Sequence, residues 1–409
     1  MMGDNLAQKY QKKTDRQHIL DTPDTYIGSI EEDEIWDWVL KENGRMGWGK
    51  IKTVPGLYKC FDEGVVNARD HRVRLEEKIK KGDKSVKPVT TIDISVDQET
   101  GVISIMNDGD GIDVAKHPEH KMWIPEMIFG HLRTSTNYNK EEDKIVGGKN
   151  GFGFKLVLIY SLWGKIETVD ANRGLKYSQE FKENLSVISK PSVRKSKRSP
   201  YTKVSFLLDY KRFGLEKLTL DMFNIIKKRT LDIAAVTDKT VRVRWNGKVL
   251  PVRSFENYID CYIGKKNETP RIYEKGGDRW EYAVCLSPLD EYTQVSFVNG
   301  IHTKKGGKHV DYILNQIIKK LIAYIVKKKK VKVKPATIKE QLMLFVNSVI
   351  VNPTFDSQTK EFMNLPVRKF GSSCVVSDKF IDKIAKLGVM ETALLTNTIK
   401  EKNAGKKTD

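Results

Sequence analysis

The most constraining feature of this sequence is the stretch LYKCFDEGVVNARDHRVRLEE at residues 57–77, whose apolar residues recur at helical spacing. Within it, Glu63, Asn67 and Asp70 recur at i, i+4 and i+7, so they share a second face of the same helix. Gly64 stands beside this polar face, although glycine costs a helix about 1 kcal/mol relative to alanine. We therefore expect another group to approach the helix closely beside the acid. The alternative is an ordinary amphipathic helix with a solvated polar face.

The length and charge of the chain limit its class. Its 409 residues exceed one ordinary core, so two domains are expected. The 72 basic and 53 acidic residues leave a net charge of +19, which favours a polyanionic partner, nucleic acid before a membrane surface. The four cysteines form no C-x-x-C pair, which argues against a zinc site and for a reducing compartment. Because no apolar run approaches the ~20 residues that span a bilayer, we expect no membrane partner.

Patterns of apolar residues predict a mixed order of strands and helices. Residues 91–106 alternate apolar and polar positions on both sides of a Gln-Glu-Thr-Gly turn, which predicts a β-hairpin. The other expected strands lie within 199–210, 239–252, 279–287 and 292–301. The expected helices are 57–79, 121–132, 154–163, 217–236 and 309–330. This order predicts an α+β sandwich with helices on one face, and a break near residue 250 predicts two domains, 1–248 and 249–409.

Two polar loops next to these elements are candidates for chemistry. The loop NDGDGI at residues 107–112 follows the hairpin, and its spacing does not fit a calcium loop because Asp113 occupies the position that needs glycine. The loop VGGKNGFGFKLVLIY at residues 146–160 is rich in glycine and enters an apolar helix, as in sites where backbone N–H groups bind phosphate. Its lysine comes one place too late for a Walker A loop. A flexible surface lid is the alternative.

The polar helix face, the loop after the hairpin and the glycine-rich loop occur in an order that resembles the GHKL ATPases, which include gyrase-type topoisomerases, the heat-shock chaperone, MutL and histidine kinases. The motifs TPDTYIGS, VPGLYKCFDE, TSTNY, GGKNGFG, SFVNGI, KGGKHVDY and NPTFDSQTKE are similar to the N-terminal ATPase region of eukaryotic-type DNA topoisomerase II. The similarity extends from Tyr10 to the 370s. It implies a GHKL α/β sandwich followed by a transducer domain of mixed β-sheet with a long helix.

The resemblance also implies a site for ATP and Mg²⁺. It implies that Glu63 is the general base that activates water against the γ-phosphate, that Asn67 is the Mg²⁺ ligand, and that Lys360 reaches the γ-phosphate from the transducer. Asp70 is expected to hold the helix or the glycine-rich loop. The further nucleotide contacts that the resemblance implies are Asn107 at the adenine amino group, Ile112, Ile128, Phe129 and Thr202 around the base, Ser135, Thr136 and Asn137 at ribose and phosphate, Gly148, Lys149, Asn150, Gly151, Phe152, Gly153 and Lys155 in the phosphate loop, Gln358, and Tyr10, which contacts the nucleotide of the other protomer.

Three residues depart from the family pattern. His71 stands where a nucleotide-contacting asparagine is expected, Phe154 replaces a small residue and Phe152 replaces a tyrosine. Histidine can still donate one hydrogen bond. We therefore expect an altered nucleotide affinity and an unchanged fold.

The implied function is that of the ATPase region, or N-gate, of a type II DNA topoisomerase. Such a region binds and hydrolyses Mg-ATP, and forms a homodimer on ATP binding that clamps a segment of double-stranded DNA. The basic run at residues 327–334 is expected to contact DNA through Lys327, Lys328, Lys329, Lys330 and Lys332, and residues 194–198 form a second basic cluster. DNA cleavage needs later domains of the same polypeptide, so we expect this chain to be a fragment of a larger enzyme. The expected location is the nucleus, or a cytoplasmic viral factory if a large DNA virus encodes the protein.

Two alternative functions remain open at this point. A stand-alone GHKL switch of the chaperone or mismatch-repair type would share the ATP site, but the QTK motif at residues 358–360 and the lysine run argue against it. A non-catalytic, basic DNA-binding scaffold would explain the charge and leave Glu63 unexplained. Either basic run also fits a solvated face or a nuclear-import signal.

Overall fold

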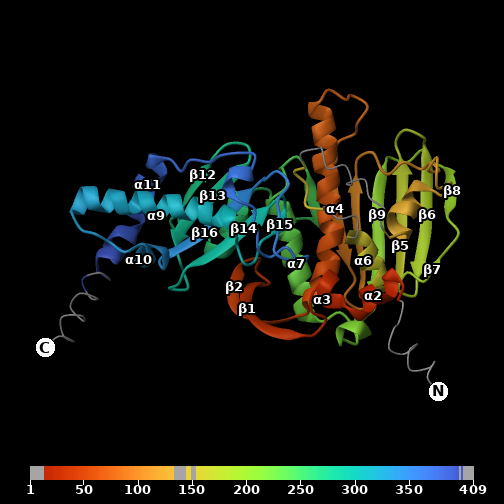
Figure 1. The fold of residues 1–409 in the computed structure, drawn as a ribbon, viewed down its shortest axis with the longest axis horizontal. Helices are drawn as coiled ribbons and strands as arrows, with labels where there is room; N and C mark the ends of the chain where they lie inside the picture. Colours follow the sequence, from red (N-terminus) through yellow and green to blue (C-terminus); the bar gives the residue numbers. More distant parts are fainter. Residues whose placement is uncertain (1–12, 133–143, 149–152, 396–397, 399–409) are drawn as a thin grey trace, which may run out of the picture.

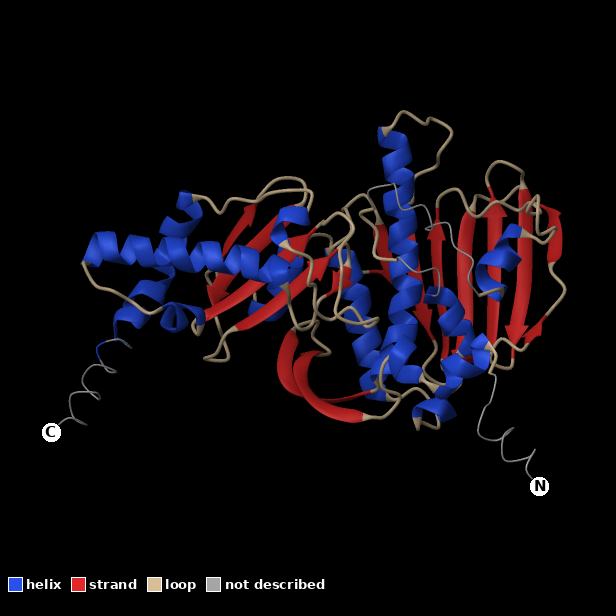
Figure 2. Cartoon of the chain, viewed as in Figure 1, coloured by secondary structure: helices blue, strands red, loops and turns tan. Residues whose placement is uncertain are grey.

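A computed structural model describes residues 13–132, 144–148, 153–395 and 398. These residues form helices and three sheets, which confirms the α+β class (Figure 1, Figure 2). Figure 1 shows the five-stranded sheet at the left and strands β9, β5 and β6 of a nine-stranded sheet at the right, with α4 between them in this view. None of the described helices combines the length and the apolar content that crossing a bilayer requires.

The nine-stranded sheet is the larger layer of the N-terminal half. Its strands, in order across the sheet, are β11 (Lys248–Val249), β10 (Arg242–Trp245), β3 (Thr91–Val96), β4 (Val102–Asp108), β9 (Tyr201–Leu208), β5 (Ser161–Asp170), β6 (Leu175–Lys182) and β7 (Val187–Ile188), while β8 (Ser192–Lys195) also pairs with β6. Only the β10–β3 pair is parallel. The predicted hairpin is confirmed as β3 and β4, whose apolar residues alternate between buried and less buried positions.

Helices cover this sheet and bring the polar helix face against it. The predicted helix at 57–79 is confirmed as α4 (Pro55–Lys80), which begins with proline at its first turn and carries lysines in its last. It packs against α6 (Gly153–Ile159), α7 (Leu220–Ala235) and strand β4. The other N-terminal elements are α2 (Asp15–Asp21), α3 (Pro23–Tyr26), the antiparallel pair β1 (Asp33–Leu40) and β2 (Met46–Thr53), α5 (Ile124–Gly130) and the short helix η1 (Tyr210–Phe213).

The C-terminal half is built on the five-stranded sheet. Its order is β12 (Ile272–Lys275), β13 (Trp280–Leu286), β16 (Leu342–Ser348), β14 (Thr293–Val298) and β15 (Ile301–His302). The predicted lysine-rich helix is confirmed as α9 (Lys308–Lys329), whose apolar face shares a core with this sheet. The remaining elements are α8 (Phe255–Ile263), α10 (Pro335–Lys339), η2 (Val367–Lys369), α11 (Asp378–Ile384) and η3 (Ala385–Val389).

One of the two buried apolar clusters of the described residues spans both halves. Phe255 and Tyr258 of α8, Phe297 of β14 and Phe345 of β16 belong to the same buried cluster as the core of the nine-stranded sheet. The halves therefore pack as one body around residues 249–263. The domain boundary at residue 248 stays a prediction.

Several predicted boundaries were wrong. The helix predicted at 154–163 ends at Ile159, and Ser161 already begins the central strand β5. The helix predicted at 121–132 extends only from Ile124 to Gly130. The expected elements also omitted β1, β2, β5, β6 and β16. A continuous apolar run does not reveal by its periodicity where a buried helix gives way to a buried strand.

Candidate functional site

A cavity of about 600 Å³ lies between α4, β4, β9, α6 and the segment 144–148. Its lining includes every residue predicted for the nucleotide site that the structure describes: Glu63, Asn67, Asn107, Ile112, Ile128, Phe129, Gly148, Gly153, Lys155, Thr202, Gln358 and Lys360. The other predicted contacts lie outside the described residues: Tyr10, Ser135, Thr136, Asn137, Lys149, Asn150, Gly151 and Phe152. The positions are thus gathered at one cavity, while their individual roles stay predictions.

Glu63 is buried at this cavity between two ammonium groups. Its Oε1 lies 2.7 Å from Nζ of Lys59, one helical turn earlier, and 3.9 Å from Nζ of Lys360. Burial alone would raise the pKa of Glu63, but the charges of Lys59 and Lys360 outweigh it and lower the pKa to about 2. The carboxylate is therefore ionised at neutral pH. The alternative of a solvated polar face is wrong, because Glu63 is only 4% exposed.

Asn67 lies one turn after Glu63 and also faces the cavity. A Cβ atom on Gly148 would lie 3.6 Å from Oδ1 of Asn67, and a Cβ atom on Gly153 would overlap Oε2 of Glu63. Gly153 therefore leaves space for the carboxylate of Glu63, while the distance at Gly148 is an ordinary van der Waals contact. Amide oxygens are acceptable ligands for Mg²⁺, which takes its other ligands from phosphates and water. The residues present fit a magnesium-bound nucleotide.

Asp70, the third member of the polar helix face, holds the start of the glycine-rich loop. Its two carboxylate oxygens accept hydrogen bonds from the backbone N–H groups of Gly147 at 2.9 Å and Gly148 at 2.8 Å. Asp70 is completely buried. Burial raises its pKa, while the charge of Arg74 and the two N–H groups oppose this rise. The expectation that Asp70 holds the helix or the loop is confirmed for the loop.

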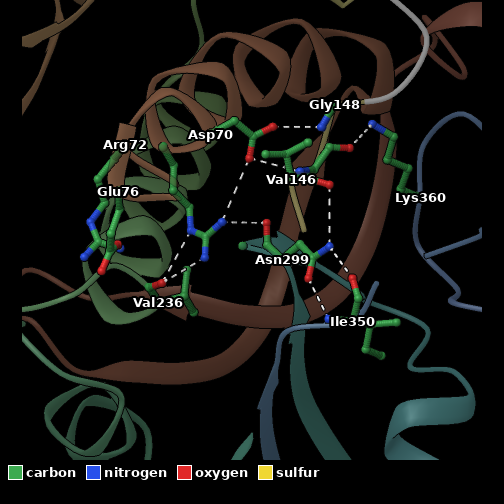
Figure 3. Close-up of polar contacts among 12 residues, drawn as sticks. Asp70, Arg72, Glu76, Val146, Gly148, Val236, Asn299, Ile350 and Lys360 are labelled. Carbon is green, nitrogen blue, oxygen red and sulfur yellow. Dashed lines mark hydrogen bonds and ion pairs between the residues drawn. The ribbon is translucent and has the colours of Figure 1, made fainter. Parts of the chain in front are cut away.

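The C-terminal half reaches the same loop segment (Figure 3). Nζ of Lys360 donates to the carbonyl oxygen of Gly147 at 3.1 Å, and this lysine is 7% exposed. Nδ2 of Asn299 donates to the carbonyl oxygen of Ile350 at 2.9 Å and contacts that of Val146 at 3.5 Å. Both halves therefore fix the backbone at the start of the glycine-rich loop.

Two buried arginines join α4 and α7 to the turn between β14 and β15. Nε of Arg229 pairs with Oδ1 of Asp62 at 2.7 Å, and its Nη2 donates to the carbonyl oxygen of Gly300 at 2.8 Å. Nη1 of Arg69 donates to the carbonyl oxygen of Asn299 at 2.9 Å. Neither arginine was predicted from the sequence, because no local pattern connects positions that are 71 and 230 apart in the chain.

Polar and apolar groups meet at the opposite end of the cavity. Asn107 is 6% exposed, and its Nδ2 donates to the carbonyl oxygen of Asp108 at 2.8 Å. Thr202 lies opposite Asn107 in the register of β4 and β9. Ile112 and Ile128 line the cavity beside them. This end therefore combines apolar walls with a few directed polar atoms, as sites for planar ligands do.

Lys155 and His71 are among the further basic side chains that line the cavity. Burial lowers the pKa of Lys155, near the start of α6, to about 8. Burial, followed by the charges of Arg74 and Lys78, lowers the pKa of His71 to about 4. His71 is therefore neutral at pH 7 and has one N–H group to donate. Its effect on nucleotide affinity stays a prediction.

Gly64 and Phe154 are explained by packing. A Cβ atom on Gly64 would lie 2.7 Å from Cδ1 of Ile105 and 3.4 Å from Cε2 of Phe154. The Phe154 ring packs edge-on against Phe129 at 5.5 Å and Phe206 at 5.8 Å between centroids. The close approach expected at Gly64 is therefore confirmed, and the core side chains of β4 and α6 make it.

The predicted DNA contacts lie elsewhere. Lys327, Lys328, Lys329, Lys330 and Lys332 are exposed at the end of α9 and just beyond it. Figure 1 places this end of α9 at the left. Strand β8, which contains the first two residues of the basic cluster at 194–198, lies at the right. The two basic clusters are thus at opposite ends of the molecule.

Comparisons with known proteins agree with this arrangement. Residues 53–211 match the family described as "Histidine kinase-, DNA gyrase B-, and HSP90-like ATPase", and residues 254–409 match "DNA gyrase B". DNA topoisomerase 2 of Acanthamoeba polyphaga mimivirus is 43% identical over 99% of this chain and 32% of that relative. The chain therefore spans about a third of the length of this curated relative.

Solved structures match over nearly the whole chain. The ATPase region of Saccharomyces cerevisiae topoisomerase II is 40% identical, with a TM-score of 0.87 over 96% of this chain and 100% of that one. The ATPase and transducer domains of DNA topoisomerase II from Balamuthia mandrillaris are 37% identical, with a TM-score of 0.88 over 97% and 99% of the two chains. Identity of this level over complete ATPase regions, with the cavity built from the expected motifs, shows that the chain belongs to the DNA topoisomerase II family and corresponds to its ATPase region.

Proposed function

We propose that this chain binds Mg-ATP in the cavity and hydrolyses it, with Glu63 as the general base. The observation that carries the proposal is an ionised, buried carboxylate and an amide, one helical turn apart, facing a cavity that glycines keep open. A base must lie within hydrogen-bond reach of the attacking water, and a helix that lines the cavity permits this. Glu63 would accept a proton from water as the water attacks the γ-phosphorus, while the bond from the γ-phosphorus to the bridging oxygen breaks and ADP leaves.

Lys360 would control the strength of this base. A carboxylate whose pKa is about 2 is a weak proton acceptor. A γ-phosphate would compete for the ammonium group of Lys360, whose Nζ lies 3.9 Å from Oε1 of Glu63. The pKa of Glu63 would then rise, because one of its two cationic neighbours is neutralised. Binding of ATP would thus make Glu63 a stronger proton acceptor.

The remaining lining residues would hold the nucleotide. Asn67 would be the protein ligand of Mg²⁺, which neutralises charge on the phosphates when it is bound. Gly148, Gly153 and Lys155 would hold the phosphates, because glycine backbones and a buried ammonium group at a helix start suit anions. Asn107 would face the adenine amino group at the other end of the cavity. We propose the same nucleotide-binding role for the predicted nucleotide contacts that lie outside the described residues.

We further propose that the chain dimerises on ATP binding and clamps double-stranded DNA. Tyr10 would contact the nucleotide of the other protomer, and the lysines at the end of α9 would touch DNA phosphates without regard to sequence. The remaining domains of a longer polypeptide would cleave the DNA and complete strand passage. The setting would be the nucleus, or a viral factory for a viral protein.

Replacing the base tests the proposal most directly. Glu63→Gln should bind a non-hydrolysable ATP analogue and lose hydrolysis by at least a hundredfold, because the amide cannot accept the proton. Glu76→Gln on the same helix is the matched control, since Glu76 pairs with Arg72 at 2.7 Å outside the cavity lining and should retain parental turnover. Parental hydrolysis by Glu63→Gln would show that another group is the base.

A second variant tests the nucleotide sensor. Lys360→Ala should slow hydrolysis and weaken nucleotide-driven dimerisation, measured by sedimentation with and without the ATP analogue. Lys305→Ala is its control, because Lys305 is exposed and pairs with Glu361 at 2.7 Å. If the Lys360 variant dimerises with ATP as well as its parent does, Lys360 is not the sensor.

A further inference from the structure

Thr168 on β5 lies behind the Asn107 end of the cavity and is completely buried. It is opposite Thr202 in the register of β5 and β9, and Thr202 is opposite Asn107 in the register of β9 and β4. Side chains opposite one another on neighbouring strands project from the same face of a sheet. Three polar side chains therefore form a row across three strands, of which Asn107 and Thr202 line the cavity and Thr168 does not.

The hydroxyl group of Thr168 uses its single proton and both lone pairs. It donates to the carbonyl oxygen of Tyr201 at 3.0 Å, because a carbonyl can only accept. It accepts from the backbone N–H of Ile112 at 2.9 Å. Its third neighbour is Oγ1 of Thr202 at 3.0 Å. Since the proton of Thr168 is already committed, Thr202 must donate in this last bond.

The proton of Thr202 therefore points away from the cavity, and its oxygen offers only lone pairs to a ligand. The amide of Asn107 also presents an acceptor oxygen. Because its Nδ2 donates to the carbonyl oxygen of Asp108, its Oδ1 is directed away from that carbonyl. Oδ1 of Asn107 and Oγ1 of Thr202 are thus two acceptor atoms on neighbouring strands at this end of the cavity.

We propose that Thr168 is a positioning residue that keeps Thr202 an acceptor and so makes this end of the cavity selective for a purine with a 6-amino group. The inference rests on the proposed function, in which a nucleotide base lies against Asn107. An exocyclic amine has two N–H groups for the two acceptors. A 6-oxo purine would instead place its carbonyl oxygen against these two acceptors, with no proton between the oxygens.

The test compares nucleotide preference rather than activity. Competition against a fluorescent ATP analogue gives the affinities of ATP, GTP and purine riboside triphosphate, which carries neither group at position 6. Thr168→Val keeps the shape and removes the hydroxyl, so the proton of Thr202 is free to turn into the cavity. We expect the preference for ATP over GTP to fall at least tenfold. Thr168→Ser restores the hydroxyl and should retain the parental preference.

Three outcomes would overturn the inference. The first is an unchanged ratio of ATP to GTP affinity in a folded Thr168→Val variant. The second is an equal loss of the preference for ATP in Thr168→Ser. The third is a further loss of this preference when Thr168→Val is added to Thr202→Val. If Thr168→Val does not fold, Thr202→Val tests the same acceptor pair, and an unchanged ratio there refutes it. Failure of the proposed function is distinguishable, because the parent chain would then bind none of the three nucleotides.

Discussion

Asp70 offers the sharpest test of how the glycine-rich loop is held. Asp70→Asn keeps the size of the side chain and one carbonyl oxygen, so one of the two backbone N–H groups of Gly147 and Gly148 keeps its acceptor. The other N–H would face an amide NH₂ group inside the protein. A hydrogen bond to a charged group contributes about 1.5–3 kcal/mol, and a buried N–H without an acceptor costs about 1–3 kcal/mol. The free energy with which Asp70 holds the loop thus falls by about 2–3 kcal/mol.

This loss should appear in nucleotide binding. If the loop must adopt its anchored conformation before it holds phosphates, the observed affinity falls with the population of that conformation. A loss of about 2–3 kcal/mol corresponds to a dissociation constant that is about 30-fold to 140-fold larger. The assay is equilibrium binding of a non-hydrolysable ATP analogue, with urea unfolding to establish that the variant is folded.

Glu76→Gln again supplies the matched control, with the same chemical change on the same helix and no contact to the loop. Its affinity should stay within threefold of the parent. A folded Asp70→Asn variant that binds the analogue within threefold of the parent would refute the reasoning, because the two hydrogen bonds would then not limit nucleotide binding.

Three other predictions concern charge. The pKa of Glu63 is lowered from 4.5 to about 2, so its ionised carboxylate contributes stability that is fully present above pH 4.5 and is lost as the pH falls through 2. In urea titrations, the difference in unfolding free energy between the parent and Glu63→Gln should therefore change by about 3 kcal/mol over this range. A constant difference would contradict this prediction. Arg229→Met leaves the buried Asp62 with only the ammonium group of Lys59, 3.8 Å away, and should lower the unfolding free energy by about 3 kcal/mol, and a loss under about 1 kcal/mol would mean that Lys59 or solvent replaces the pair. Replacing Lys327 to Lys330 by glutamine should reduce the slope of log affinity for duplex DNA against log salt by roughly 0.9 for each DNA phosphate that the lysines no longer neutralise, whereas an unchanged slope would place the DNA elsewhere.

Local patterns were sufficient for the elements that present the site. The spacing of Glu63, Asn67 and Asp70 predicts one helix face because an α-helix has a fixed period, and α4 has that face. The alternation around the hairpin places Asn107 at the end of β4 in the same way. These signals lie within about twenty residues of one another, where period and turn chemistry decide the structure.

Contacts between distant segments could not be predicted in this way. Lys59 precedes Glu63 by four residues and would usually form a solvated ion pair on a helix surface. It is 3% exposed because the rest of the chain covers this turn of α4, and only burial makes its charge strong enough to change the pKa of Glu63. The partners of Asn299 and Arg229 likewise depend on how the two halves pack, which no spacing within either half specifies.

The turn between β14 and β15, where Arg69 and Arg229 bind successive carbonyl groups, also limits how the molecule can bend. Opening that seam would remove the carbonyl acceptors of two buried guanidinium groups, at a cost of about 1.5–3 kcal/mol for each hydrogen bond to a charged group. Residues 146–148, by contrast, are held by individual hydrogen bonds that a phosphate group could replace one at a time. Loss of a γ-phosphate would therefore first change the backbone conformation of these three residues, while the seam stays in place.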